Sequence, residues 1–63
     1  MKVRTHLSNG HEVSCEVVRL NNTHVWLQVP KKYGGTVLRR NRRHVVEADQ
    51  PKLVDELERR RRE

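Results

Sequence analysis

Apolar residues recur at every second position in three stretches of the chain, and a period of two is typical of a half-buried β-strand. Asn9 and Gly10 separate the first two stretches, and this pair is a strong hairpin signal because both residues tolerate positive φ. A second turn is predicted where Asn21, Asn22 and Thr23 precede the third stretch. The side chains that we expect to face the core are Val3, Thr5, Leu7, Val13, Cys15, Val17, Val25, Leu27 and Val29.

The alternation slips by one position in the second stretch. Val17 and Val18 are adjacent, and Leu20 continues the phase of Val18. A slip of this kind indicates a β-bulge or a sharp bend. Small barrels need such a bend so that one long strand can serve both halves of the sheet.

Two more short strands are expected after the third one. Pro30 ends the third strand because proline has no N–H to donate to the ladder. Residues 31–35 are expected to form a glycine-containing loop, and residues 36–40 a fourth strand. Residues 41–43 are predicted to form one tight turn before a short fifth strand over residues 44–48.

The last part of the chain predicts a short α-helix over residues 52–62. Asp49 is suited to the N-cap position, and Pro51 is tolerated in the first turn of a helix. An apolar stripe at helical spacing is available to pack on the sheet, and it consists of Leu53, Val54 and Leu57. We therefore expect a single domain, with a small β-barrel over residues 1–50 and a C-terminal helix with a basic end over residues 51–63.

Together these elements predict a mainly β protein, a small five-stranded, strongly bent antiparallel barrel followed by a short C-terminal α-helix. Residues 3–48 contain the motifs V-x-T-x-L-x-N-G, V-x-C-x-V-V and H-V-W-L-Q-V and a basic turn before H-V-V, and with this pattern they resemble the Sm-like and KOW-like small β-barrels. The resemblance implies an Sm-like or Src-homology-3-like barrel. Sm-like proteins usually carry their helix before the first strand, whereas here it follows the fifth, which argues against ring assembly of the Sm kind.

The chain is strongly basic, with 14 Lys and Arg against 8 Asp and Glu and a formal net charge of +6. Six of the cations and no acid fall within residues 31–44, the basic segment, and these cations are Lys31, Lys32, Arg39, Arg40, Arg42 and Arg43. Such a charge distribution favours nucleic acid or another acidic partner. The alternative is a charge that serves only solubility.

The basic segment suits phosphate binding, because arginine holds phosphate through two hydrogen bonds and turns expose backbone N–H groups to anions. Alternation puts Arg39 and Arg40 on opposite faces of their strand, so the two cannot hold one ligand. Alternation also points Trp26 away from the core, where it can stack on a base. If the helix stripe covers Trp26 instead, Tyr33 in the loop becomes the stacking candidate.

Other chemistry finds little support in the sequence. Cys15 is the only cysteine, so no internal disulfide can form, and a lone thiol fits a reducing, cytoplasmic setting. The 4 histidines are scattered without metal-ligand spacing, and no catalytic motif occurs, so we expect no metal, no cofactor and no enzymatic activity. No window approaches the ~18 apolar residues of a membrane span, so no membrane contact is expected.

We therefore expect a non-catalytic nucleic-acid-binding module, with RNA or single strands favoured over duplex because no recognition helix is evident. Its predicted site comprises Trp26, Lys31, Lys32, Tyr33, Arg39, Arg40, Arg42 and Arg43. The alternative is a small protein-interaction module or regulator, for example one encoded by a phage or mobile element. It would bind an acidic protein or form a homo-oligomer through the edge strands of the barrel.

Overall fold

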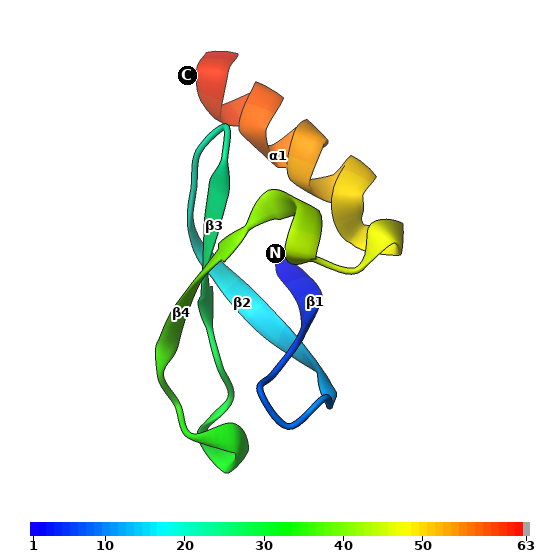
Figure 1. Cartoon of the computed structure of the whole chain (residues 1–63). Coiled ribbons are helices and arrows are strands. Elements are labelled where there is room, and N and C mark those ends of the chain that lie inside the picture. Colours follow the sequence, from blue (N-terminus) through cyan, green and yellow to red (C-terminus); the bar gives the residue numbers. More distant parts are fainter. Residues whose placement is uncertain (63) are drawn as a thin grey trace.

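The computed structural model describes residues 1–62 and contains a four-stranded antiparallel sheet followed by a C-terminal helix (Figure 1). The strands lie side by side in chain order, and they are β1 (Lys2–His6), β2 (Glu12–Leu20), β3 (His24–Gln28) and β4 (Val37–Asn41). Three 3-10 turns, η1 (Lys31–Tyr33), η2 (Arg42–His44) and η3 (Glu47–Asp49), precede the helix α1 (Gln50–Arg62). The mainly β class with a C-terminal helix is confirmed.

β2 is shared by two hairpins that meet end to end. Its first half pairs with β1, and its second half pairs with β3. The predicted turn between β1 and β2 is confirmed, since Gly10 adopts a φ of +85° and the Asn9 side chain accepts a hydrogen bond from the backbone N–H of His11. The long strand β2 therefore belongs both to the β1–β2 hairpin and to the β2–β3 hairpin.

A bulge interrupts β2 at the predicted position. Val17 pairs with Leu27, but the next pair joins Arg19 to Trp26, so Val18 is an extra residue without a partner on β3. Val18 is 50% exposed, whereas Leu20 is only 8% exposed. The two residues do not share a face, although their spacing suggested the same phase, because the bulge changes the alternation between them.

One apolar core lies on the inner face of the sheet, which we define as the face that α1 covers. Leu53 of α1 is fully buried in this core, and Leu57 packs against its margin. Val54, the third residue of the predicted stripe, is exposed. The remaining buried apolar residues are Val3, Val13, Cys15, Val17, Leu20, Val25, Leu27, Val29 and Val45.

The prediction of a closed five-stranded barrel is wrong, because residues 44–48 do not form a strand. Their contact with β1 is reduced to one isolated bridge between Thr5 and Val45. The backbone N–H of Val46 also donates a hydrogen bond to the carbonyl oxygen of Arg4 at 2.9 Å. The sheet is therefore open, and a short irregular segment lies along its β1 edge.

Two side chains explain why this segment turns instead of extending. Asn41 caps η2, because its side-chain oxygen accepts a hydrogen bond from the backbone N–H of Arg43. Gln50 Nε2 donates to the carbonyl oxygens of Arg42 and Val45, at 2.5 and 3.1 Å. These carbonyls therefore bond to a side chain rather than to a neighbouring strand.

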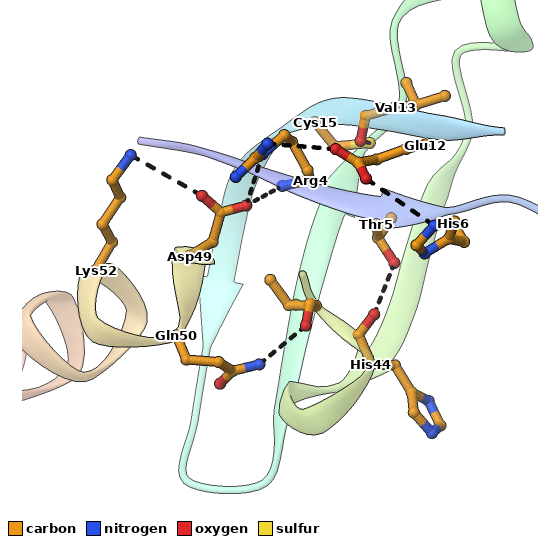
Figure 2. A network of polar contacts seen from close by, with 11 residues as sticks. Arg4, Thr5, His6, Glu12, Val13, Cys15, His44, Asp49, Gln50 and Lys52 are labelled. Atoms are coloured by element: carbon orange, nitrogen blue, oxygen red, sulfur yellow. Dashed lines mark hydrogen bonds and ion pairs between the residues drawn. The ribbon is translucent and has the colours of Figure 1, made fainter. Parts of the chain in front are cut away.

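A buried carboxylate ties the start of α1 to β1 (Figure 2). Asp49 Oδ2 accepts hydrogen bonds from the backbone N–H of Arg4 at 2.8 Å and from Arg4 Nε at 3.2 Å, and Lys52 Nζ lies 3.9 Å from Oδ1. Asp49 was expected to cap the helix, but its carboxylate is directed to the neighbouring strand, and α1 begins at Gln50. Asp49 therefore connects the start of α1 to β1 instead of capping the helix.

Among the described helices, none is long and apolar enough to cross a membrane.

Candidate nucleic-acid interface

The outer face of the sheet, opposite the core and α1, carries a row of three side chains that we call the outer-face row. Strand pairing places Trp26 of β3 between Arg19 of β2 and Arg39 of β4. The Arg19 guanidinium carbon lies 4.9 Å from the centre of the Trp26 ring, which is cation–π geometry. An aromatic ring can stack on a base while the cations on either side of it contact the flanking phosphates.

The helix leaves Trp26 uncovered. Leu53 of α1 belongs to the same buried core as Val25 and Leu27, the residues on either side of Trp26 in β3. Because successive side chains of a strand point to opposite faces, Trp26 projects from the other side of the sheet. Trp26 is half-buried, and the ring of His24 lies 6.3 Å from its own, centre to centre.

Arg19 was not among the predicted site residues, and the bulge explains why. In a regular ladder that continued from the pair of Val17 and Leu27, Val18 would lie opposite Trp26. The extra residue advances β2 by one position and brings Arg19 there instead. The slipped alternation predicts a bulge at this position, but it does not show which residue of β2 then lies opposite Trp26.

The loop with Lys31, Lys32 and Tyr33 lies away from this row. All three side chains are exposed, and Lys32 Nζ lies 5.2 Å from the centre of the Tyr33 ring. Gly34 and Gly35, with φ of +118° and +68°, let the chain reverse after η1. Figure 1 shows this loop at the end of the molecule opposite α1, whereas η2 lies beside α1. β4 therefore divides the basic segment into separate groups.

Arg40 projects to the inner side of β4, as alternation predicted. It pairs with Val25 across the sheet, while Arg39 pairs with Trp26. Burial raises the pKa of the Cys15 thiol above its ordinary value, and the nearby Arg40 charge only partly opposes this effect. Arg40 thus acts at the margin of the core, and the structure does not bring it together with Arg39.

Arg42 and Arg43 have different environments although they are adjacent. Arg42 donates from its backbone N–H to the carbonyl of Thr23 at 3.0 Å and from Nη1 to the carbonyl of Asn22 at 3.2 Å. Its Nε is buried without a hydrogen-bond partner among the described atoms. Arg43 is exposed. Arg42 therefore holds the turn between β2 and β3, and Arg43 is the cation of this pair that a ligand can reach.

A pocket of about 790 Å³ opens between this turn, η2 and η3. Val45 and Val46 supply its apolar wall, and Arg43 and His44 supply charge and hydrogen-bonding capacity. The predicted interface is thus resolved into three parts, namely the outer-face row, the loop after β3 and this pocket. The outer-face row is the part where an aromatic ring and cations meet on a regular element.

No protein-family model matches this chain, and comparisons with curated proteins and with solved structures gave no match.

Proposed function

We propose that this chain is a non-catalytic module that binds single-stranded nucleic acid on the outer face of its sheet. The observation that carries the proposal is the position of Trp26, between Arg19 and Arg39 on a face that α1 does not cover. One base stacks on the face of the Trp26 ring that the Arg19 guanidinium does not cover, and Arg19 and Arg39 contact the phosphates on either side of the base. The excess of positive charge over the whole chain, +6, attracts the strand.

A single strand suits this surface better than a duplex. Stacking on Trp26 requires an unpaired base, because the faces of bases inside a duplex are already stacked. The one α-helix among residues 1–62 is held on the inner face by Leu53 and Asp49. On its exposed face, Arg59 and Arg60 are paired with Glu56 at 3.8 and 3.4 Å, which lowers the charge that this helix offers to a major groove.

The geometry sets the expected salt dependence. Arg19 and Arg39 flank Trp26, and Arg43 is the nearest exposed cation on the following turn. With three phosphate contacts to a single strand, a plot of the log binding constant against the log salt concentration has a slope of roughly −2. Affinity should then fall about 15-fold between roughly 50 and 200 mM salt. A slope near −4, as expected if all six cations of the basic segment acted together, would show that the loop after β3 also binds.

The first experiment is a fluorescence titration with single-stranded RNA, single-stranded DNA and duplex DNA. Trp26 is the only tryptophan, so its quenching reports contact at the outer-face row. We expect quenching by single strands that weakens with salt. Anisotropy of a labelled oligonucleotide then compares Trp26→Leu and Arg39→Ala with the wild-type chain.

Arg59→Ala is the matched control, since Arg59 is an exposed cation of α1 paired with Glu56 at 3.8 Å. Stacking of one base is worth about 1–3 kcal/mol, so Trp26→Leu should weaken binding by about 5-fold or more. Arg39→Ala should weaken binding well beyond Arg59→Ala, although both remove one positive charge. Equal affinities for these two arginine variants would contradict the proposal.

A protein partner is the second candidate, and the open edge of the sheet supports it. β4 pairs with β3 on one side, and no strand among the described residues pairs with its other side. An extended acidic segment could add to this edge beside Arg39 and Arg40. A second copy would bring the same arginines together and is disfavoured by repulsion. Absence of binding to every nucleic acid tested, with intact folding, would favour this candidate.

A further inference from the structure

The pocket between the β2–β3 turn, η2 and η3 begins where the outer-face row ends. The next cross-strand pair on the outer face joins His24 to Asn41, and Asn41 lines the pocket. Thr23 also lines it, and the Thr23 hydroxyl lies 2.8 Å from His24 Nδ1. Two residues along a strand span about 7 Å, so the pocket lies one short step beyond Trp26.

The pocket combines an apolar wall with groups that can hold a phosphate. Val45 and Val46 line one side, and Arg43 and His44 lie on η2 with exposed side chains. Its volume of about 790 Å³ falls within the range of about 300–1,000 Å³ that is common for small-molecule sites. This volume is large enough for a base and its sugar, and because Glu47 also lines the pocket, the phosphate belongs on the side of Arg43 and His44.

Two amides in the pocket wall each have one end engaged in the fold. The side-chain oxygen of Asn41 accepts a hydrogen bond from the N–H of Arg43, and Gln50 Nε2 donates to the carbonyls of Arg42 and Val45. Among the described side chains, Asn41 Nδ2 and Gln50 Oε1 have no such partner. These internal bonds fix the orientation of both amides. The NH₂ group of Asn41 and the side-chain oxygen of Gln50 then remain as donor and acceptor for the edge of a base.

We infer that this pocket is a second nucleotide subsite, which takes the base next to the one stacked on Trp26. Arg39 and Arg43 contact the phosphate between the two nucleotides, His44 contacts the sugar–phosphate of the second nucleotide, and the two amides bond to the edge of the second base. This inference rests on the proposed function and extends it. The ligand is a single strand of at least two nucleotides, which crosses β3 from Arg19 to Arg39 and then runs along β4 toward η2.

The test compares a nucleoside monophosphate with short single-stranded oligonucleotides, using the wild-type chain, Arg43→Ala, His44→Ala and the control Arg59→Ala. Replacing Arg43 leaves its backbone N–H bond to Asn41 intact, so the fold of η2 is retained. We expect Arg43→Ala to weaken oligonucleotide binding about tenfold, as for one hydrogen bond to a charged group. For this variant the slope of the log binding constant against the log salt concentration should be less steep by ~0.7, the value for one phosphate contact to a single strand. Quenching of Trp26 by the monophosphate should not change.

Nuclear magnetic resonance supplies an independent measurement on the wild-type chain. The side-chain amide signals of Asn41 and Gln50 should shift with a dinucleotide or longer strand and should stay in place with the monophosphate. If Arg43→Ala and His44→Ala bind as Arg59→Ala does and the amide signals do not move, while Arg39→Ala still weakens binding, the subsite is wrong and the outer-face row stands. If Arg39→Ala and Trp26→Leu are also without effect, the proposed function fails and the subsite fails with it.

Discussion

Replacement of Asp49 by alanine should destabilise this protein more than any change of a surface charge. The carboxylate is 4% exposed and accepts the backbone N–H of Arg4 at 2.8 Å. The Arg4 side chain is 42% exposed, so solvent weakens the ion pair, and most of the effect comes from the hydrogen bond of the Arg4 backbone N–H. Loss of a hydrogen bond to a buried charge, with a donor left unpaired, costs about 3 kcal/mol.

That loss is large for a chain of 63 residues, whose total stability is expected to be about 3–9 kcal/mol. The melting temperature should fall by more than about 10 °C, since 1 kcal/mol corresponds to about 4–8 °C in a domain of this size. Urea unfolding followed by circular dichroism measures the change directly. Asp55→Ala is the matched control, because Asp55 is an exposed acid on α1, the helix that Asp49 ties to β1.

The effect should also depend on pH. Burial of the Asp49 carboxylate opposes ionisation, but the hydrogen bonds from Arg4 and the charges of Arg4 and Lys52 outweigh burial, so its pKa lies below the ordinary value. The stabilisation is therefore fully present above the unfolded-state pKa of about 3.9 and is lost as the pH falls through the lower folded-state value. Asp49→Asn should lack this contribution to acid unfolding. A loss below about 0.5 kcal/mol in Asp49→Ala, equal to that of Asp55→Ala, would refute this account of how α1 is held.

Three further predictions concern the core and the bulge. Leu53→Ala should cost about 3 kcal/mol in urea unfolding because Leu53 is fully buried, and a loss below about 1 kcal/mol would contradict docking of α1 on the sheet. Val18→Thr should change stability by less than about 0.5 kcal/mol, whereas Leu20→Ala, two positions further along β2, should cost about 2 kcal/mol or more. The Cys15 thiol is buried and its pKa is raised, so a thiol reagent at neutral pH should label it only as the chain unfolds, and rapid labelling of the folded protein would show otherwise.

The alternation of apolar and polar residues predicted the sheet well, because a few residues are enough to show which face of a strand is buried. The alternation through Val13, Cys15 and Val17 and through Val25 and Leu27 matches the observed burial. The prediction of a fifth strand was wrong because alternation does not show which groups will bond to the backbone of a segment. A short apolar segment is extended only if its backbone groups find a neighbouring strand, and here side chains satisfy several of them first.

The candidate site was predicted in its parts but not in its grouping. Trp26 and the opposed faces of Arg39 and Arg40 followed from alternation alone. The sequence shows a continuous run of cations, yet a five-residue strand, β4, separates Lys31 and Lys32 from the arginines of η2. Charge density along a chain therefore says little about charge density on a surface. The link between Arg19 and Trp26 needed the cross-strand register, which only the folded sheet defines.

The arrangement of β2 between two consecutive hairpins has a consequence for folding kinetics. Every pair of adjacent strands in the sheet is also adjacent in sequence, so each can form by closing a short loop. The segment from Val45 to α1 is different, because it reaches β1 across about forty residues through Thr5 and Arg4. We expect the three hairpins of the sheet to form in the transition state and this segment to dock afterwards. Substitution of Asp49 should then speed unfolding and leave the folding rate nearly unchanged.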